Sequence, residues 1–136
     1  MDLNPATTAF PENVTFLAAD ALNPGEEFRA ILNAWKPFSL VISDMAPKTT
    51  GSRFTDQARS LELAGEALAL ARACLIHGGH FVVKIFMGPD VKAFMDSMRG
   101  DFEKVKTAKP DSSRSESFEQ FIVGLGFKGS ARISEE

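Results

Sequence analysis

Residues 38–47, FSLVISDMAP, decide the fold. The first six residues are mostly apolar and have the length of a buried strand, which stops at the acidic turn that begins with Asp44. A helical pattern follows at about residues 55–76 with Gly78-Gly79 as its stop, and residues 81–86 form another apolar run of strand length. A strand, a helix and a strand in this order predict a parallel βαβ unit and therefore an α/β sheet.

Further elements extend this unit in both directions. The expected elements are a buried strand at 14–19, an amphipathic helix at 26–35, a short helix at about 90–98, and strands at 102–109 and 119–127. No helix separates the last two strands, so we expect them to pair as an antiparallel hairpin. The chain therefore reads as a single domain, residues 1–136, with an open sheet and helices on both of its faces.

The composition excludes several classes of protein. With 136 residues, of which 44% are apolar and 24% charged, the chain has the proportions of one ordinary soluble domain, unlike a disordered or collagen-like chain. Its apolar runs are far shorter than the roughly 20 residues of a membrane-spanning helix. Residues 1–5 lack a signal-peptide pattern and Cys74 is the single cysteine, so we expect a cytoplasmic protein. A net charge of −3 argues against nonspecific binding of polyanions.

Three charged residues are expected at one edge of the sheet. Ligands of open α/β sheets bind beyond the carboxyl ends of the parallel strands, and Asp44 ends one such strand. Lys84 lies within the strand at 81–86, where it must reach solvent or a carboxylate because an unpaired buried ammonium is costly. Glu119 opens the last strand, whose antiparallel direction brings it to the same edge. Spacing alone leaves simpler roles open: Asp44 as a turn cap, Lys84 extended to solvent, and Glu119 solvated.

Several strings of residues occur in an order that is found in one enzyme family. They are Asp44-Met45-Ala46-Pro47, Val82-Val83-Lys84-Ile85-Phe86, Lys109-Pro110-Asp111-Ser112-Ser113-Arg114 and Ser117-Phe118-Glu119, with Asp56, Arg59-Ser60 and Gly78-Gly79. In order and spacing, the sequence resembles the FtsJ-like (RrmJ) ribosomal RNA 2′-O-ribose methyltransferases over essentially its whole length. The resemblance implies a Rossmann-like sheet of strand order 3-2-1-4-5-7-6 that binds S-adenosylmethionine and acts on large-subunit ribosomal RNA.

The resemblance also implies roles for single residues. The matched positions are Asp44, Lys84 and Glu119 for catalysis, as the last three members of the family's Lys-Asp-Lys-Glu tetrad; Asp2, Asp20 and Asp44 for the cofactor; and Ser113 and Arg114 for RNA. From composition alone, the segment with Ser113 and Arg114 is a solvated loop. A ribose 2′-hydroxyl is a poor nucleophile until it loses its proton, so the enzyme must supply alignment and a proton acceptor. Our hypothesis is that Lys84 accepts this proton or stabilises the forming alkoxide, while Asp44 and Glu119 orient it.

Two parts of the family pattern are absent from the sequence. No Gly-rich segment precedes Asp2, and no earlier lysine matches the first member of the tetrad. We therefore expect a sheet that lacks the first two strands of the family, as in a fragment, a gene model begun at an internal start, or one piece of an assembly that supplies the rest. A genuine short protein with a rearranged sheet or an edge-paired dimer is the less favoured alternative. The strand at 38–43 would then expose an apolar edge through which the chain self-associates. The alternative to the catalytic half of a methyltransferase is a non-catalytic remnant that binds RNA or a protein partner.

A metal-dependent hydrolase is a third and poorly supported interpretation. It would be built on Asp44, Asp56 and Glu119. His77 and His80 flank Gly78-Gly79 and are more plausible as turn residues than as ligands. No histidine and carboxylate spacing typical of a metal site is present, so no metal is expected.

Overall fold

The computed structural model describes residues 25–44, 50–109 and 119–129, in two units that divide after Lys36. In the first unit it describes helix α1, Glu26–Trp35, with the bounds that the sequence predicted. Glu26 and Glu27 suit the positive end of the helix dipole. The backbone N–H of Lys36 closes the helix by donating to Leu32, and Pro37 follows. The strand predicted at 14–19 lies outside the described residues.

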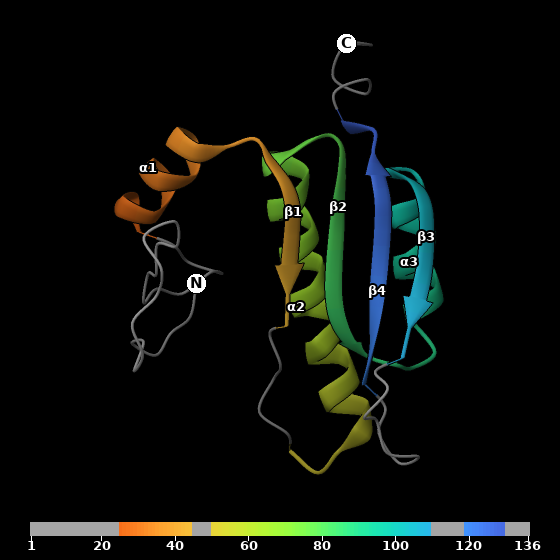
Figure 1. Cartoon of the computed structure of the whole chain (residues 1–136). Coiled ribbons are helices and arrows are strands. Elements are labelled where there is room, and N and C mark those ends of the chain that lie inside the picture. Colours follow the sequence, from red (N-terminus) through yellow and green to blue (C-terminus); the bar gives the residue numbers. More distant parts are fainter. Residues whose placement is uncertain (1–24, 45–49, 110–118, 130–136) are drawn as a thin grey trace. The chain divides into compact units, whose positions relative to one another are not determined.

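The second unit is an α/β sheet. Its elements are β1 Phe38–Ser43, α2 Arg53–Cys74, β2 Leu75–Phe86, α3 Val91–Arg99, β3 Phe102–Ala108 and β4 Glu119–Phe127. The strand order is β1-β2-β4-β3, with β1 parallel to β2 and with β4 antiparallel to both of its neighbours (Figure 1). This order is the 4-5-7-6 part of the order that the family resemblance implied, and the antiparallel pairing of β3 and β4 is confirmed.

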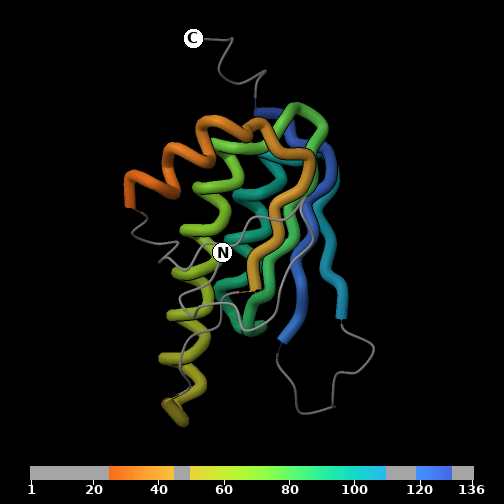
Figure 2. The backbone as a smooth tube through the Cα atoms, turned by 60° about the vertical axis from the view of Figure 1, so that its left-hand side comes forward, coloured from red at the N-terminus to blue at the C-terminus, as the bar shows by residue number. Residues whose placement is uncertain are grey.

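The hydrophobic core lies on one face of this sheet. Alternate residues of β2, Phe81, Val83 and Ile85, are buried against α2 and α3, which both lie on that face (Figure 2). Helices were predicted on both faces of the complete sheet, and both described helices of the second unit lie on this face. The strands β1, β2 and β3 are parallel and each crossover moves in the same direction along the sheet. Right-handed crossovers in one direction place both helices on one face.

The boundary between α2 and β2 differs from the prediction. The helix ends at Cys74 because Leu75 is extended, and Gly78-Gly79 lie inside β2 instead of stopping the helix. Gly78 has φ +88°, which favours glycine. A Cβ on Gly79 would lie 2.9 Å from the carbonyl oxygen of Ile76 and 3.2 Å from that of Ser39. The glycines therefore allow β2 to pass closely beside β1, where the pairing register shifts.

Strand β1 is less buried than the sequence predicted. The side chains of Leu40 and Ile42 are 48% and 62% exposed. They alternate with Val41, which packs against the core on the helix side. Within the described residues β1 pairs with β2 alone, so it presents the apolar edge that the sequence analysis expected. No helix of the described residues is long and apolar enough to cross a membrane.

Candidate active site

Lys84 lies where β1 ends and β4 begins. Its Nζ is 3.7 Å from Oδ2 of Asp44 and 3.8 Å from Oε2 of Glu119. The parallel pairing of Ser43 with Val83 places Asp44 beside Lys84, and the antiparallel pairing of Phe86 with Glu119 brings in the second carboxylate. The structure therefore brings together the three side chains that strand direction and alternation predicted at this edge.

The electrostatics of this cluster are those of an accessible, acidic site. The exposed fractions of the side chains are 23% for Lys84, 42% for Glu119 and 71% for Asp44. Both nitrogen to oxygen distances exceed the usual length of a hydrogen bond, so the exposed carboxylate of Asp44 keeps acceptor capacity for other groups. Because one lysine faces two carboxylates, the cluster favours a cationic ligand that carries hydrogen-bond donors.

Side chains of α2 fix the end of β2 near Lys84. Ser60 is buried and its Oγ accepts a hydrogen bond of 2.9 Å from the backbone N–H of Phe86. The side-chain amide of Gln57 donates to the carbonyl oxygen of Met87 at 2.7 Å. A Cβ on Gly88 would lie 2.7 Å from the Gln57 side chain, so only glycine fits there without movement. These contacts attach the end of β2 to α2 just after Lys84.

Asp56 has a structural role in the described residues. It is buried, and its Oδ1 accepts hydrogen bonds of 2.9 Å from both the N–H and the hydroxyl of Thr50. It therefore fixes the segment that leads into α2, and it is not a member of the Lys84 cluster. His80 lies in β2, where its Nδ1 accepts a hydrogen bond of 3.3 Å from the N–H of Gly126. These contacts account for two of the residues weighed as metal ligands.

Phe121 is a neighbour of Lys84 that the sequence analysis did not single out. Its ring centroid lies 5.9 Å from Nζ of Lys84, and the two residues face each other across β2 and β4. Alternation along β4 places Phe121 on the same face as Glu119. Together with the register between β2 and β4, this alternation would have identified Phe121 as a neighbour of Lys84. The other predicted site residues, Asp2, Asp20, Ser113 and Arg114, lie outside the described residues.

The family model for FtsJ-like methyltransferases matches residues 1–127. The chain belongs to the FtsJ-like methyltransferase family. Among curated members, it is 62% identical over 128 residues to the ribosomal RNA large subunit methyltransferase E of Nitratidesulfovibrio vulgaris strain Miyazaki F, covering 94% of this chain and 64% of that protein. It is 56% identical over 135 residues to the protein of the same name from Oleidesulfovibrio alaskensis, covering 99% of this chain and 65% of the relative. The chain thus spans somewhat less than two thirds of the length of these relatives.

Solved structures agree with the family assignment. A Plasmodium falciparum protein described as a ribosomal RNA methyltransferase matches with a TM-score of 0.65 and 26% identity, covering 76% of this chain and 53% of that one. A Streptococcus mutans protein described as a methyltransferase, in complex with SAH, matches with a TM-score of 0.52 and 12% identity, covering 93% and 68%. The second match shows the fold alone. Together they confirm that the described sheet is part of a Rossmann-like methyltransferase fold.

Proposed function

We propose that this chain is the catalytic part of an enzyme that transfers a methyl group from S-adenosylmethionine to a ribose 2′-hydroxyl of large-subunit ribosomal RNA. The observation that carries the proposal is Lys84 between Asp44 and Glu119, at the edge where the parallel strands end. The curated relatives support the substrate, because they are named ribosomal RNA large subunit methyltransferases. The cytoplasm, which holds the ribosomes of such bacteria, is the proposed location.

The acidic side chains of the site fit this cofactor. The exposed carboxylate of Asp44 is suited to accept hydrogen bonds from amino or hydroxyl groups, and the negative cluster suits a sulfonium cation. When bound there, S-adenosylmethionine would supply an activated methyl group on a positively charged sulfur, for transfer to the ribose oxygen. Asp2 and Asp20 are further proposed cofactor contacts, and Ser113 and Arg114 are proposed RNA contacts.

The protein's own groups act on the ribose hydroxyl. As a neutral amine, Lys84 accepts the proton of this hydroxyl and becomes an ammonium; as an ammonium, it instead donates a hydrogen bond to the oxygen as it becomes an alkoxide. Asp44 and Glu119 lie on either side of the lysine and orient its ammonium group. Alignment of the hydroxyl with the methyl group contributes the remaining rate acceleration, because a reaction between fixed partners avoids the entropy cost of bringing them together.

A second candidate function is that of a non-catalytic chain that binds RNA or a protein partner. The exposed apolar side chains of Leu40 and Ile42 favour it, since such a surface is typical of a contact between chains. The same surface supports self-association through β1 as part of either proposal.

A titration and a transfer assay separate the two functions. Binding of S-adenosylmethionine to the purified chain is measured by calorimetry, and methyl transfer is measured with radiolabelled cofactor and large ribosomal subunits. We expect Lys84→Ala to lower the transfer rate by about 10²–10⁴-fold, the usual contribution of a proton-transferring group, while cofactor affinity changes little.

The matched control is Lys92→Ala, which removes an exposed lysine from α3 and should leave transfer unchanged. Undiminished transfer by Lys84→Ala would remove this lysine from the mechanism. A wild-type chain that neither binds the cofactor nor transfers methyl groups would favour a fragment or the non-catalytic chain.

A further inference from the structure

The Lys84 ammonium has an aromatic neighbour as well as two acidic ones. The Phe121 ring centroid lies 5.9 Å from Nζ, within the distance at which a cation is attracted to the face of a ring. The contact follows from the sheet itself, because Lys84 and Phe121 are direct cross-strand partners in β2 and β4. Phe121 also lies two residues after Glu119, so the ring and the carboxylate project from the same face of β4.

The carboxylates alone do not fix the position of the ammonium. Asp44 is 71% exposed and Glu119 is 42% exposed, and neither lies within hydrogen-bonding distance of Nζ. Exposed ion pairs of this kind are screened by water and hold long side chains weakly. A lysine side chain has a flexible stem and loses considerable rotamer freedom when it is fixed, so an additional contact is needed to keep its charge in one place.

We propose that Phe121 is a positioning residue that holds the Lys84 ammonium between Asp44 and Glu119. This inference rests on the proposed methyl transfer, for which it adds the group that keeps the lysine aligned. The half-buried ring of Phe121 lies beside the lysine and attracts its charge, which reduces the number of positions that the ammonium adopts between the carboxylates. Phe121 touches no reacting atom, so its effect is exerted through Lys84.

Two substitutions of Phe121 distinguish the effect of its aromatic ring from the effect of its apolar volume. Phe121→Leu removes the ring and keeps a large aliphatic side chain, and Phe121→Tyr restores the ring. We expect Phe121→Leu to lower kcat for methyl transfer roughly threefold to thirtyfold, which corresponds to about 0.5–2 kcal/mol for a cation–π contact, while KM for S-adenosylmethionine is unchanged. Phe121→Tyr should recover most of the rate.

The contact between Lys84 and Phe121 can also be measured by NMR, independently of methyl transfer. In the full chain labelled with ¹³C-lysine, the Cε–Hε signal of Lys84, assigned by its loss in Lys84→Arg, should shift in Phe121→Leu and stay in place in Phe121→Tyr. Val123→Ala is the matched control, because it removes apolar atoms from the same face of β4 without removing a ring. It should affect neither the signal nor kcat.

Two outcomes overturn the proposal. One is an unchanged Lys84 signal and kcat in Phe121→Leu, and the other is an equal effect of Val123→Ala, which would indicate general loss of packing. Failure of the proposed function looks different: the wild-type chain would transfer no methyl group although the Lys84 signal still responded to the loss of the ring. In that case the contact would be supported and its role in methyl transfer overturned.

Discussion

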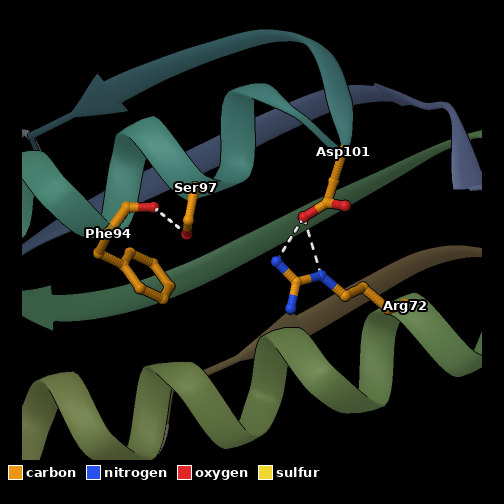
Figure 3. Close-up of polar contacts among 4 residues, drawn as sticks. All are labelled: Arg72, Phe94, Ser97 and Asp101. Atoms are coloured by element: carbon orange, nitrogen blue, oxygen red, sulfur yellow. Dashed lines mark hydrogen bonds and ion pairs between the residues drawn. The ribbon is translucent and has the colours of Figure 1, made fainter.

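Asp101 follows α3 and is fully buried, although it carries a carboxylate. Its Oδ2 accepts a hydrogen bond of 2.8 Å from Nε of Arg72 and lies 2.6 Å from Nη2 of the same residue (Figure 3). Its backbone carbonyl accepts from the N–H of Lys128 at 2.7 Å. One residue therefore ties together α2, the turn after α3 and the end of β4. Its role is structural, since it lies apart from the residues that contact Lys84.

Replacing Asp101 by asparagine should destabilise the fold. We expect Asp101→Asn to lower the free energy of unfolding by about 1–3 kcal/mol, the range for a buried hydrogen-bonded charge that loses its partner. The loss stays below that of a fully buried ion pair because Arg72 is 42% exposed. Urea unfolding followed by circular dichroism measures the change.

Asp96→Asn provides the control for this prediction. Asp96 also pairs with an arginine, Arg99, but both side chains are more than half exposed on α3. Its replacement should change the free energy of unfolding by less than about 0.5 kcal/mol. Equal effects of the two substitutions would contradict the structural role assigned to Asp101.

At the residue scale, the sequence predicted the acidic and basic side chains that lie at strand ends. Asp44 and Glu119 were found from strand direction, and Lys84 from alternation within an apolar run. The pairing of Arg72 with Asp101 was not predicted, because no periodicity relates a helix residue to a distant turn. The contact of Phe121 was missed because it depends on the register between β2 and β4, which residue patterns alone do not fix.

At the element scale, local signals predicted most boundaries. The bounds of α1 and β1 agree with the prediction, since acidic residues begin the helix and Pro37 separates the two elements. The end of α2 was wrong because pairing of Leu75 with Phe38 starts β2 before the glycines are reached. Tertiary pairing thus outweighed a glycine signal that usually ends helices.

Gly79 should tolerate no side chain. We expect Gly79→Ala to lower the free energy of unfolding by about 1–3 kcal/mol, because its Cβ would lie within 3.2 Å of two backbone carbonyl oxygens that cannot move independently. Gly65→Ala is the matched control, since Gly65 lies exposed in α2 with nothing within 4 Å of an added Cβ. It should stabilise the chain by about 0.5–1 kcal/mol through helix propensity. Thermal unfolding that ranks the two variants in the opposite order would refute this account of β2.

At the scale of the whole second unit, the two faces of the sheet differ. Both helices cover the face with Phe81, while Leu40 and Ile42 project from the other face at the β1 edge. The family resemblance implied the strand order, and the placement of α2 and α3 on one face follows from the direction of the crossovers. An exposed apolar strand at a sheet edge is a site where chains pair.

The proposed self-association through β1 is tested with Leu40→Lys, which should weaken it. We expect the apparent dissociation constant of the dimer, from sedimentation velocity at several concentrations, to rise about tenfold or more, because a leucine side chain no longer becomes buried between copies. Phe54→Lys is the control: Phe54 is 78% exposed near the start of α2, and its replacement introduces the same charge outside β1. Equal weakening by both substitutions would indicate a general effect of charge and would contradict the assignment of the contact between copies to β1.

The distribution of the Lys84 cluster over three strands has a consequence for folding kinetics. Asp44, Lys84 and Glu119 meet only after a long helix has joined β1 to β2 and after β4 has returned between β2 and β3. Contacts between residues so distant in sequence require large loops to close, and they form slowly. The cluster therefore has no local precursor in the unfolded chain. It appears when β1 and β4 have both paired with β2 and is lost as soon as either of them detaches, so a probe at Lys84 reports the assembly of these three strands.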